Sequence, residues 1–290
     1  MALVPSVLRA AAALAVAGAL LLAACTAPPA SETTAPQSAA TGTTAPPQPA
    51  SDPLAFTTST VGPPRSNARG ELYEPKGTGP FPAVVVLHGC SGVSAHTRAW
   101  GERLASWGYV ALVVDSFRPR GQANVCGRGR DIPPSSRAAD AFGAAAYLRM
   151  LPTVRPDAIG LIGFSHGGWT TLHAVLADAG KADRAEPFRA AVAYYPYCEM
   201  PTAPLATDTL ILIGDADDWT PSTRCERWRD TIKTSGHALE MTIYPGALHA
   251  FDSALPTRVY YGHKLGHDPA AAADSIDKTR AFLAARLAPP

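Results

Sequence analysis

The sequence lacks an excess of charge of either sign. Its 25 Lys and Arg residues nearly balance 24 Asp and Glu residues, which leaves a formal net charge of +1 at pH 7. A nucleic-acid-binding surface needs clustered basic residues, and an acidic partner needs the same. This balance therefore gives no reason to expect nucleic acid or an acidic surface as a partner.

Metal-ligand spacings and internal repeats are also missing. None of the five cysteines has the spacing typical of a zinc site. His263, His267 and Asp268 lie close together, but Gly262 and Gly266 argue against a rigid ligand helix, and the segment is interpreted as a solvated loop. We expect no metal and no other cofactor.

No apolar run is long enough to predict a membrane-spanning helix. The longest, Val7 to Leu22, is short and rich in alanine, which is typical of a signal peptide. The letters LAAC that end at Cys25 resemble the bacterial lipoprotein box, in which the cysteine is lipidated. We therefore expect residues 1–24 to be a signal peptide and Cys25 to anchor an exported cell-envelope protein to a membrane. Ordinary secretion is the alternative.

Large apolar side chains are scarce from residue 26 to residue 64, where Ala, Pro, Thr, Ser and Gln dominate. Such a segment buries too little surface to offset its ordering entropy, so residues 25–64 are predicted to form a disordered tether. The remaining residues, 65–290, are long enough for one α/β domain.

Strand-like and helix-like segments alternate through residues 65–290. The predicted strands are Ala83–Leu87, Tyr109–Val114, Ala158–Phe164, Ala190–Tyr195, Thr209–Ile213 and Leu239–Tyr244. The predicted helices are Thr97–Trp107, Ser135–Leu151, His166–Ala179, Pro221–Ser235 and Pro269–Leu287. Most strands are apolar on consecutive residues, as strands buried on both faces are. The alternation predicts an α/β fold, with a mostly parallel sheet covered by helices on both faces and a functional site at the carboxyl ends of the strands.

The motif GFSHGG places Ser165 between a predicted strand and a predicted helix. A turn this sharp strains the serine backbone, and the neighbouring glycines lack the Cβ atoms that would clash. A surface serine in a glycine-rich turn is the alternative. The strand before the motif and the helix after it favour a catalytic nucleophile.

A serine nucleophile needs a general base and a carboxylate that orients the base. In this type of fold the chain order is Ser, then Asp or Glu, then His. His249 follows the last predicted strand, and Asp215, Asp217 and Asp218 follow the strand before it. All three aspartates are candidates on chain order alone.

The chain resembles the dienelactone hydrolase family of α/β-hydrolases from about Arg69 to Ala284. The resemblance rests on HGCSG at 88–92, DSF at 115–117, GFSHGG at 163–168, GDADDWTP at 214–221 and YPGALHAF at 244–251. It implies that Asp217 is the acid and His249 the base, and that Asp215 and Asp218 cap the loop. It also implies an oxyanion hole made by the backbone N–H groups of Cys90 and His166.

Departures from the family pattern concern the substrate. Ser165 stands where the family has a cysteine, Gly89 where it has a glutamate, and Ser253 where it has an arginine that binds the substrate carboxylate. Arg118 or Arg120 is the candidate for a second such arginine. These departures predict a small neutral ester, cleaved through an acyl-enzyme, rather than a small anionic lactone.

Alternatives remain open on sequence alone. The chain could be a peptidase of the same fold, although it has no room for a propeller or cap domain, or a catalytically silent surface lipoprotein that binds a ligand. Trp219 lies two residues from Asp217 and could either wall the substrate pocket or anchor the core.

Four cysteines besides Cys25 are Cys90, Cys126, Cys198 and Cys225. An even number in an exported protein suggests disulfides, with four free thiols as the alternative. In the usual sheet order of the fold that the chain resembles, the strands before Cys90 and Cys126 are neighbours, as are those before Cys198 and Cys225. The resemblance therefore favours the pairs Cys90–Cys126 and Cys198–Cys225.

Overall fold

The computed structural model of the chain describes residues 54–57, 67–179 and 185–288. All of them belong to one compact unit within residues 49–290. The predicted signal peptide, the lipidation site at Cys25 and most of the predicted tether lie outside the described residues. Among the residues described, no helix combines the length and the apolarity needed to cross a membrane.

An eight-stranded sheet forms the centre of the molecule, in the order β1-β2-β4-β3-β5-β6-β7-β8. Its strands are β1 (Leu54–Thr57), β2 (Asn67–Tyr73), β3 (Phe81–Leu87), β4 (Val110–Asp115), β5 (Val154–Phe164), β6 (Ala190–Tyr194), β7 (Thr209–Gly214) and β8 (Leu239–Tyr244). The six strands from β4 to β8 in this order are parallel, whereas β1 and β2 are antiparallel at one edge. The predicted mostly parallel sheet is confirmed.

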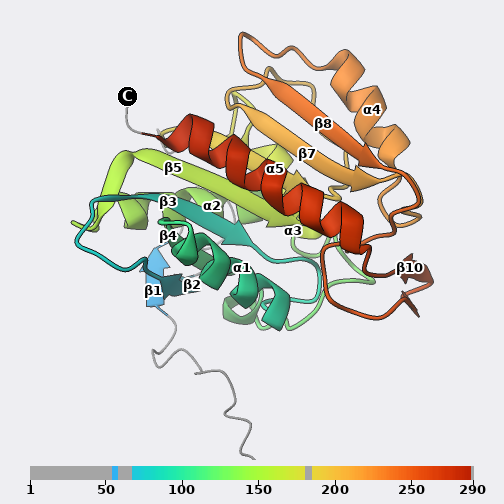
Figure 1. Cartoon of the computed structure of the whole chain (residues 1–290), viewed down its shortest axis with the longest axis horizontal. Helices are drawn as coiled ribbons and strands as arrows, with labels where there is room; N and C mark the ends of the chain where they lie inside the picture. Colours follow the sequence, from blue (N-terminus) through green and yellow to red (C-terminus); the bar gives the residue numbers. More distant parts are fainter. Residues whose placement is uncertain (1–53, 58–66, 180–184, 289–290) are drawn as a thin grey trace, which may run out of the picture. The chain divides into compact units, whose positions relative to one another are not determined.

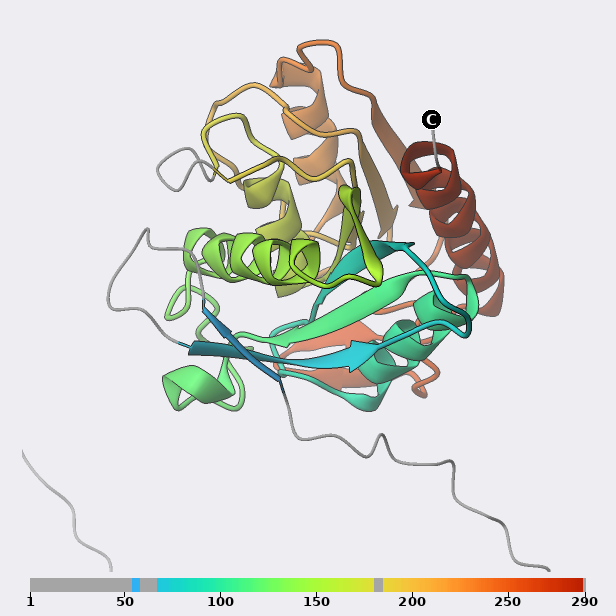
Figure 2. The ribbon, with the colours of Figure 1, turned by 90° about the vertical axis from the view of Figure 1, so that its left-hand side faces the viewer.

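Helices cover both faces of the sheet, which explains why its central strands are apolar on consecutive residues. The helices are α1 (Ala95–Ser106), α2 (Pro134–Arg149), α3 (His166–Ala174), α4 (Ser222–Thr231) and α5 (Pro269–Leu287), with a short 3₁₀ turn, η1, at Arg118–Arg120. Helices α1 and α5 lie on one face, and α2 and α3 lie on the other (Figures 1 and 2). The predicted α/β architecture is therefore present.

The predicted boundary between tether and domain at residue 64 is wrong in one respect. Residues Leu54–Thr57 form β1, which pairs with Asn67–Gly70 of β2. A four-residue edge strand is held through backbone hydrogen bonds to a single neighbour, so it needs few large side chains. Composition alone therefore did not reveal it.

Residues near His263 form a hairpin, not the solvated loop that the glycines suggested. Strand β9 (Arg258–Tyr260) pairs antiparallel with β10 (His263–Leu265). Tyr261 and Gly262 both have positive φ, as a tight two-residue hairpin turn requires. His263 contacts Asp218, with 3.4 Å between Nδ1 and Oδ1, and Asp268 accepts backbone hydrogen bonds as the N-cap of α5. In the sequence, His263 and Asp268 looked like members of a metal site, and in the structure they make these contacts instead.

Helix α3 ends at Ala174, five residues before the predicted end at Ala179. Leu176 instead forms an isolated antiparallel bridge with Leu205, which draws the chain out of the helix. Helix α4 likewise ends at Thr231, earlier than predicted.

Candidate active site

Ser165 lies on the turn between β5 and α3, with φ 53° and ψ −114°. A Cβ on Gly163 would overlap the carbonyl of Gly167, and a Cβ on Gly167 would overlap the carbonyl of Leu87. Only glycine permits this close approach of strand and helix. The turn therefore holds the serine in a strained conformation beside the N-terminus of α3, as the motif predicts.

His249 comes to Ser165 from the loop after β8. Its Nε2 lies 2.9 Å from Ser165 Oγ, and its Nδ1 lies 2.7 Å from Asp217 Oδ2. Both His249 and Asp217 are buried. The three side chains form one hydrogen-bonded chain from carboxylate to hydroxyl, which is the geometry of a serine hydrolase triad.

Asp217 is fixed by its own loop. Its Oδ1 accepts hydrogen bonds from the backbone N–H groups of Trp219 and Thr220, and Thr220 Oγ1 lies 2.7 Å from Oδ2. Burial alone would raise the pKa of Asp217, but the charge of His249 and these hydrogen bonds outweigh burial and hold the pKa below its usual value. The carboxylate is therefore ionised at neutral pH. Thr220 was not predicted from sequence, although it lies within the motif GDADDWTP.

The two competing aspartates point elsewhere. Asp215 Oδ1 accepts the backbone N–H of Gly246, and Asp218 Oδ1 accepts that of Lys264. Both side chains are exposed. Asp217 is the aspartate that the structure brings to His249.

The expected oxyanion donors lie on two segments that meet at Ser165. His166 is the first residue of α3, so its N–H has no partner within the helix. Cys90 follows β3, and both residues line a cavity together with Ser165.

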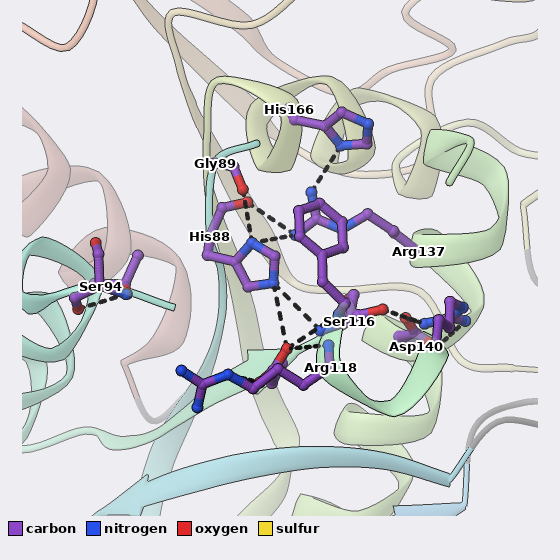
Figure 3. A network of polar contacts seen from close by, with 12 residues as sticks. His88, Gly89, Ser94, Ser116, Arg118, Arg137, Asp140 and His166 are labelled. Carbon is purple, nitrogen blue, oxygen red and sulfur yellow. Dashed lines mark hydrogen bonds and ion pairs between the residues drawn. The ribbon is translucent and has the colours of Figure 1, made fainter. Parts of the chain in front are cut away.

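A buried arginine connects these two segments (Figure 3). Arg137 of α2 donates from Nη1 to Nδ1 of His166, at 2.7 Å, and from Nη2 to the carbonyl oxygen of His88, at 2.8 Å. Its guanidinium carbon lies 4.8 Å from the ring centre of Phe117. Arg137 is fully buried and was not predicted, because an arginine within a helix carries no sequence signal for such a position.

The protonation of His166 follows from its neighbours. Burial, and then the charge of Arg137, lower the pKa of His166 to about 3, so the ring is neutral at neutral pH. Because Nδ1 accepts from Arg137, Nε2 carries the proton and donates to the carbonyl of Gly129 at 2.7 Å. Burial lowers the pKa of Arg137 to about 9, which leaves the guanidinium charged at pH 7.

His88 is also held as a neutral ring. Burial, and then the charge of Arg137, lower its pKa well below the usual value. Its Nε2 accepts the backbone N–H of Ser116 at 3.3 Å, so Nδ1 carries the proton and donates to the carbonyl of Gly89 at 2.7 Å. The ring therefore holds the loop that leads to Cys90.

A second buried carboxylate, Asp252, holds a ring that contacts His249. Asp252 accepts hydrogen bonds from His96 Nε2, Trp100 Nε1 and the Tyr195 hydroxyl, at 2.8, 3.0 and 2.7 Å. Burial would raise the pKa of Asp252, but the charge of His96 and these bonds hold it below its usual value. The ring of Tyr195 lies 4.8 Å from that of His249, centre to centre. Asp252 thus positions a ring against which His249 packs.

Both predicted disulfides are present. Cys90 bonds to Cys126, and Cys198 bonds to Cys225. The first ties the loop after β3 to the segment after η1. The second ties the segment after β6 to α4.

The candidate substrate arginines do not lie with the triad, which corrects that expectation. Arg120 makes a bidentate ion pair with the buried carboxylate of Asp140 and donates to the carbonyl of Ser116. Arg118 is exposed, 3.9 Å from Asp115. A buried carboxylate needs a paired cation, and this need accounts for the position of Arg120.

Two cavities open beside Ser165. The aromatic cavity, about 200 Å³, is lined by Trp169, Tyr197, Trp219 and His166 as well as by the Cys90–Cys126 disulfide. The His249 cavity, about 210 Å³, is lined by His249, Tyr195, Ser253 and Leu255, and shares Trp219 with the first. Trp219 is therefore a pocket wall, and its ring stacks on that of His263 at 4.8 Å.

The sheet, the strained serine turn and the order of the three side chains define an α/β-hydrolase. A sequence model of the dienelactone hydrolase family matches residues 68–287, and the chain belongs to that family. It is therefore a hydrolase of the dienelactone hydrolase type.

Known proteins with related sequences or structures agree with this class. A Bradyrhizobium protein named "Probable 2-oxo-3-(5-oxofuran-2-ylidene)propanoate lactonase" is 27% identical over 199 residues, which cover 62% of this chain and 77% of that protein. A dienelactone hydrolase-like promiscuous phosphotriesterase from metagenomic libraries is similar in structure, with a TM-score of 0.65, 22% identity, and coverage of 81% of this chain and 98% of the other. An esterase of Thermogutta terrifontis with bound propionate has a TM-score of 0.59, 19% identity and coverage of 81% and 96%.

Proposed function

We propose that the protein is a carboxylic ester hydrolase that cleaves small neutral esters with Ser165, His249 and Asp217 as its catalytic triad. The observation that carries the proposal is the continuous chain of contacts from Asp217 through His249 to Ser165, with 2.7 and 2.9 Å between the bonded atoms. Cys90 and His166 supply the oxyanion hole through their backbone N–H groups.

The proposed reaction has two half-reactions. Ser165 Oγ attacks the ester carbonyl carbon while His249 Nε2 takes the hydroxyl proton, and the carbonyl oxygen becomes an oxyanion held by the two N–H groups. The carbon–oxygen bond to the alcohol then breaks, His249 gives its proton to the leaving oxygen, and an acyl-enzyme remains. Water repeats the sequence, with His249 again as the base, and releases the acid and Ser165.

Two positions support a neutral substrate and a serine mechanism. Gly89 lies beside the nucleophile, and a Cβ there would be 3.6 Å from Ser165 Cβ, so a glutamate would bring a carboxylate next to the hydroxyl. Ser253 lines the His249 cavity and brings no charge to it. A substrate carboxylate gains no cation at either position. The arginines that line the two cavities, Arg130 and Arg258, are exposed, and Arg130 already pairs with Glu199.

Labelling with a fluorophosphonate and turnover of p-nitrophenyl acetate test the proposal together. The wild-type protein is expected to label once and to hydrolyse the ester, and Ser165→Ala is expected to do neither. A wild-type protein that neither labels nor turns over the ester would instead be a binding protein. Amide substrates in the same assay test the peptidase alternative.

We also propose that the chain is an exported lipoprotein, anchored to a membrane through Cys25. Two disulfides in the folded part support an oxidising compartment. Incorporation of radiolabelled palmitate and its loss in Cys25→Ala test the anchor. Release of an unlabelled wild-type protein into the medium would favour ordinary secretion.

A further inference from the structure

The two cavities beside Ser165 differ in their relation to the catalytic groups. Both contain Ser165 and Cys90, but His249 lines only the His249 cavity and His166 lines only the aromatic cavity. The following inference rests on the proposed triad mechanism. Given that mechanism, the difference indicates which cavity holds the alcohol part of an ester and which holds the acyl part.

The leaving alcohol must lie beside His249. Its oxygen takes the proton from His249 Nε2, which lies 2.9 Å from Ser165 Oγ. The alcohol part therefore occupies the His249 cavity. The acyl part extends the other way, into the aromatic cavity that both oxyanion residues, Cys90 and His166, line.

The aromatic cavity is lined mainly by the rings of Trp169, Tyr197 and Trp219, with the exposed Arg130 also at its lining. Trp169 is buried, donates from Nε1 to the carbonyl of Glu199 at 2.9 Å, and packs edge-on against the rings of His166 and Tyr197. Trp219 also lines the cavity. The contacts of Trp169 already hold its ring in place, so a flat group that packs on it requires little reorganisation.

The size of the aromatic cavity suits a single ring. An apolar cavity of about 150 Å³ is large enough to bind benzene, and this one has about 200 Å³. Aromatic walls favour a planar aromatic guest through edge-to-face and offset contacts. We propose that the acyl group of the preferred ester is an aromatic carboxylic acid with one ring, such as a benzoyl group.

Three p-nitrophenyl esters with the same leaving group test this proposal: the acetate, the cyclohexanecarboxylate and the benzoate. Each kcat/KM is divided by the rate constant of hydroxide-catalysed hydrolysis, which removes the intrinsic difference in reactivity. The corrected value for the benzoate is expected to exceed those of the other two by about tenfold or more, because only the flat ring makes the aromatic contacts. A corrected value for benzoate at or below that of acetate would overturn the proposal.

Variants connect the preference to the cavity. Tyr197 is half-buried, so the variant Tyr197→Leu is expected to fold. It should lower the benzoate-to-acetate ratio of corrected kcat/KM values by several-fold. Trp169→Leu is expected to lower the ratio further. Tyr147→Leu, which changes a half-buried tyrosine of α2 that lines neither cavity, is the matched control and should keep the wild-type ratio. An equal ratio in Tyr197→Leu, Trp169→Leu and wild type would contradict the assignment.

A pair of isomers tests the direction of binding. Methyl benzoate and phenyl acetate contain the same atoms, with the ring on the acyl side in one and on the alcohol side in the other. After the same correction, methyl benzoate is expected to be the better substrate. If phenyl acetate is preferred, the acyl and alcohol sides are reversed. Turnover of p-nitrophenyl acetate without any preference for benzoate refutes this inference alone, whereas no turnover of any ester refutes the proposed function.

Discussion

Two buried histidines near Ser165, His249 and His166, have partners of opposite charge. We call the surroundings of His249 the base side and those of His166 and Cys90 the oxyanion side. On the proposed base side, Nδ1 of His249 lies 2.7 Å from the carboxylate of Asp217. On the oxyanion side, His166 faces the guanidinium of Arg137, which opposes protonation. Both rings are buried within the same site. Burial and the guanidinium together therefore hold His166 as a neutral support, whereas the carboxylate partner of His249 suits that ring to the proposed role of general base.

The largest effect is expected on the base side. Ser165→Ala removes the nucleophile, and we expect kcat for p-nitrophenyl acetate to fall by about 10³-fold or more. Adding His249→Ala should lower activity little further, because the triad acts as one unit. Steady-state kinetics of the single and double variants check this, and near-wild-type activity in Ser165→Ala would refute the mechanism.

The next largest effect on kcat is expected for changes at Asp217, the proposed acid of the triad. Asp217→Asn keeps the shape but removes the charge that orients His249, and kcat is expected to fall by about 10²-fold or more. Asp215→Asn is the control from the same loop and should retain most of the activity, because Asp215 contacts only the backbone of Gly246. The opposite ranking would show that the acid was assigned to the wrong residue.

Arg137 tests the oxyanion side. Arg137→Gln removes the link between the loop of Cys90 and the first residue of α3, and kcat is expected to fall by about 10- to 100-fold with KM little changed, because the oxyanion forms only in the transition state. Arg137→Lys keeps the charge and should restore part of kcat. The exposed Arg118→Gln is the control. A rise in KM with unchanged kcat would mean that Arg137 supports only substrate binding.

The base side could be predicted from sequence and the oxyanion side only in part. Ser165, His249 and the aspartate loop each follow a strand, and parallel strands end at one edge of the sheet, so chain order brings them together. Asp217 was selected within its loop by the resemblance to the family. Arg137 lies within α2, and its partners come from the ends of β3 and β5, so only the packed structure shows the contact. Strands β1 and β2 and the hairpin β9–β10 were missed for a related reason, since antiparallel strands at an edge or in a short hairpin are stabilised by backbone pairing and not by a strong apolar pattern.

Loss of either disulfide should lower Tm by a similar amount, but the two losses should lower kcat to different extents. In the chain-entropy model, closing loops of 36 and 27 residues stabilises the fold by about 3–4 kcal/mol each, less any strain. Cys90→Ser is expected to lower both Tm and kcat, because we propose that Cys90 presents an oxyanion N–H. Cys198→Ser should lower Tm by a similar amount with a smaller loss of kcat. Thermal melts and kinetics of both variants check this, and equal losses of kcat would remove the distinction.

The last effect concerns acid stability, and it follows from the neutral histidines near the proposed oxyanion side. Burial lowers the pKa of His173 in α3 to about 4, and His166 next to Ser165 has a pKa of about 3. An unfolded chain protonates these rings near pH 6.5, so between pH 6.5 and pH 4 the unfolded state binds more protons than the folded state. The free energy of unfolding must therefore decrease as the pH falls through this window, by up to about 1.4 kcal/mol per pH unit for each ring.

His173→Gln removes one such ring without touching the triad, so the slope of unfolding free energy against pH between 4 and 6 should decrease by about one proton. Urea unfolding at a series of pH values measures that slope, and the variant and wild type should have parallel curves above pH 7. An unchanged slope below pH 6 would mean that His173 is protonated in the fold, and that the neutral histidines are confined to the contacts of Arg137.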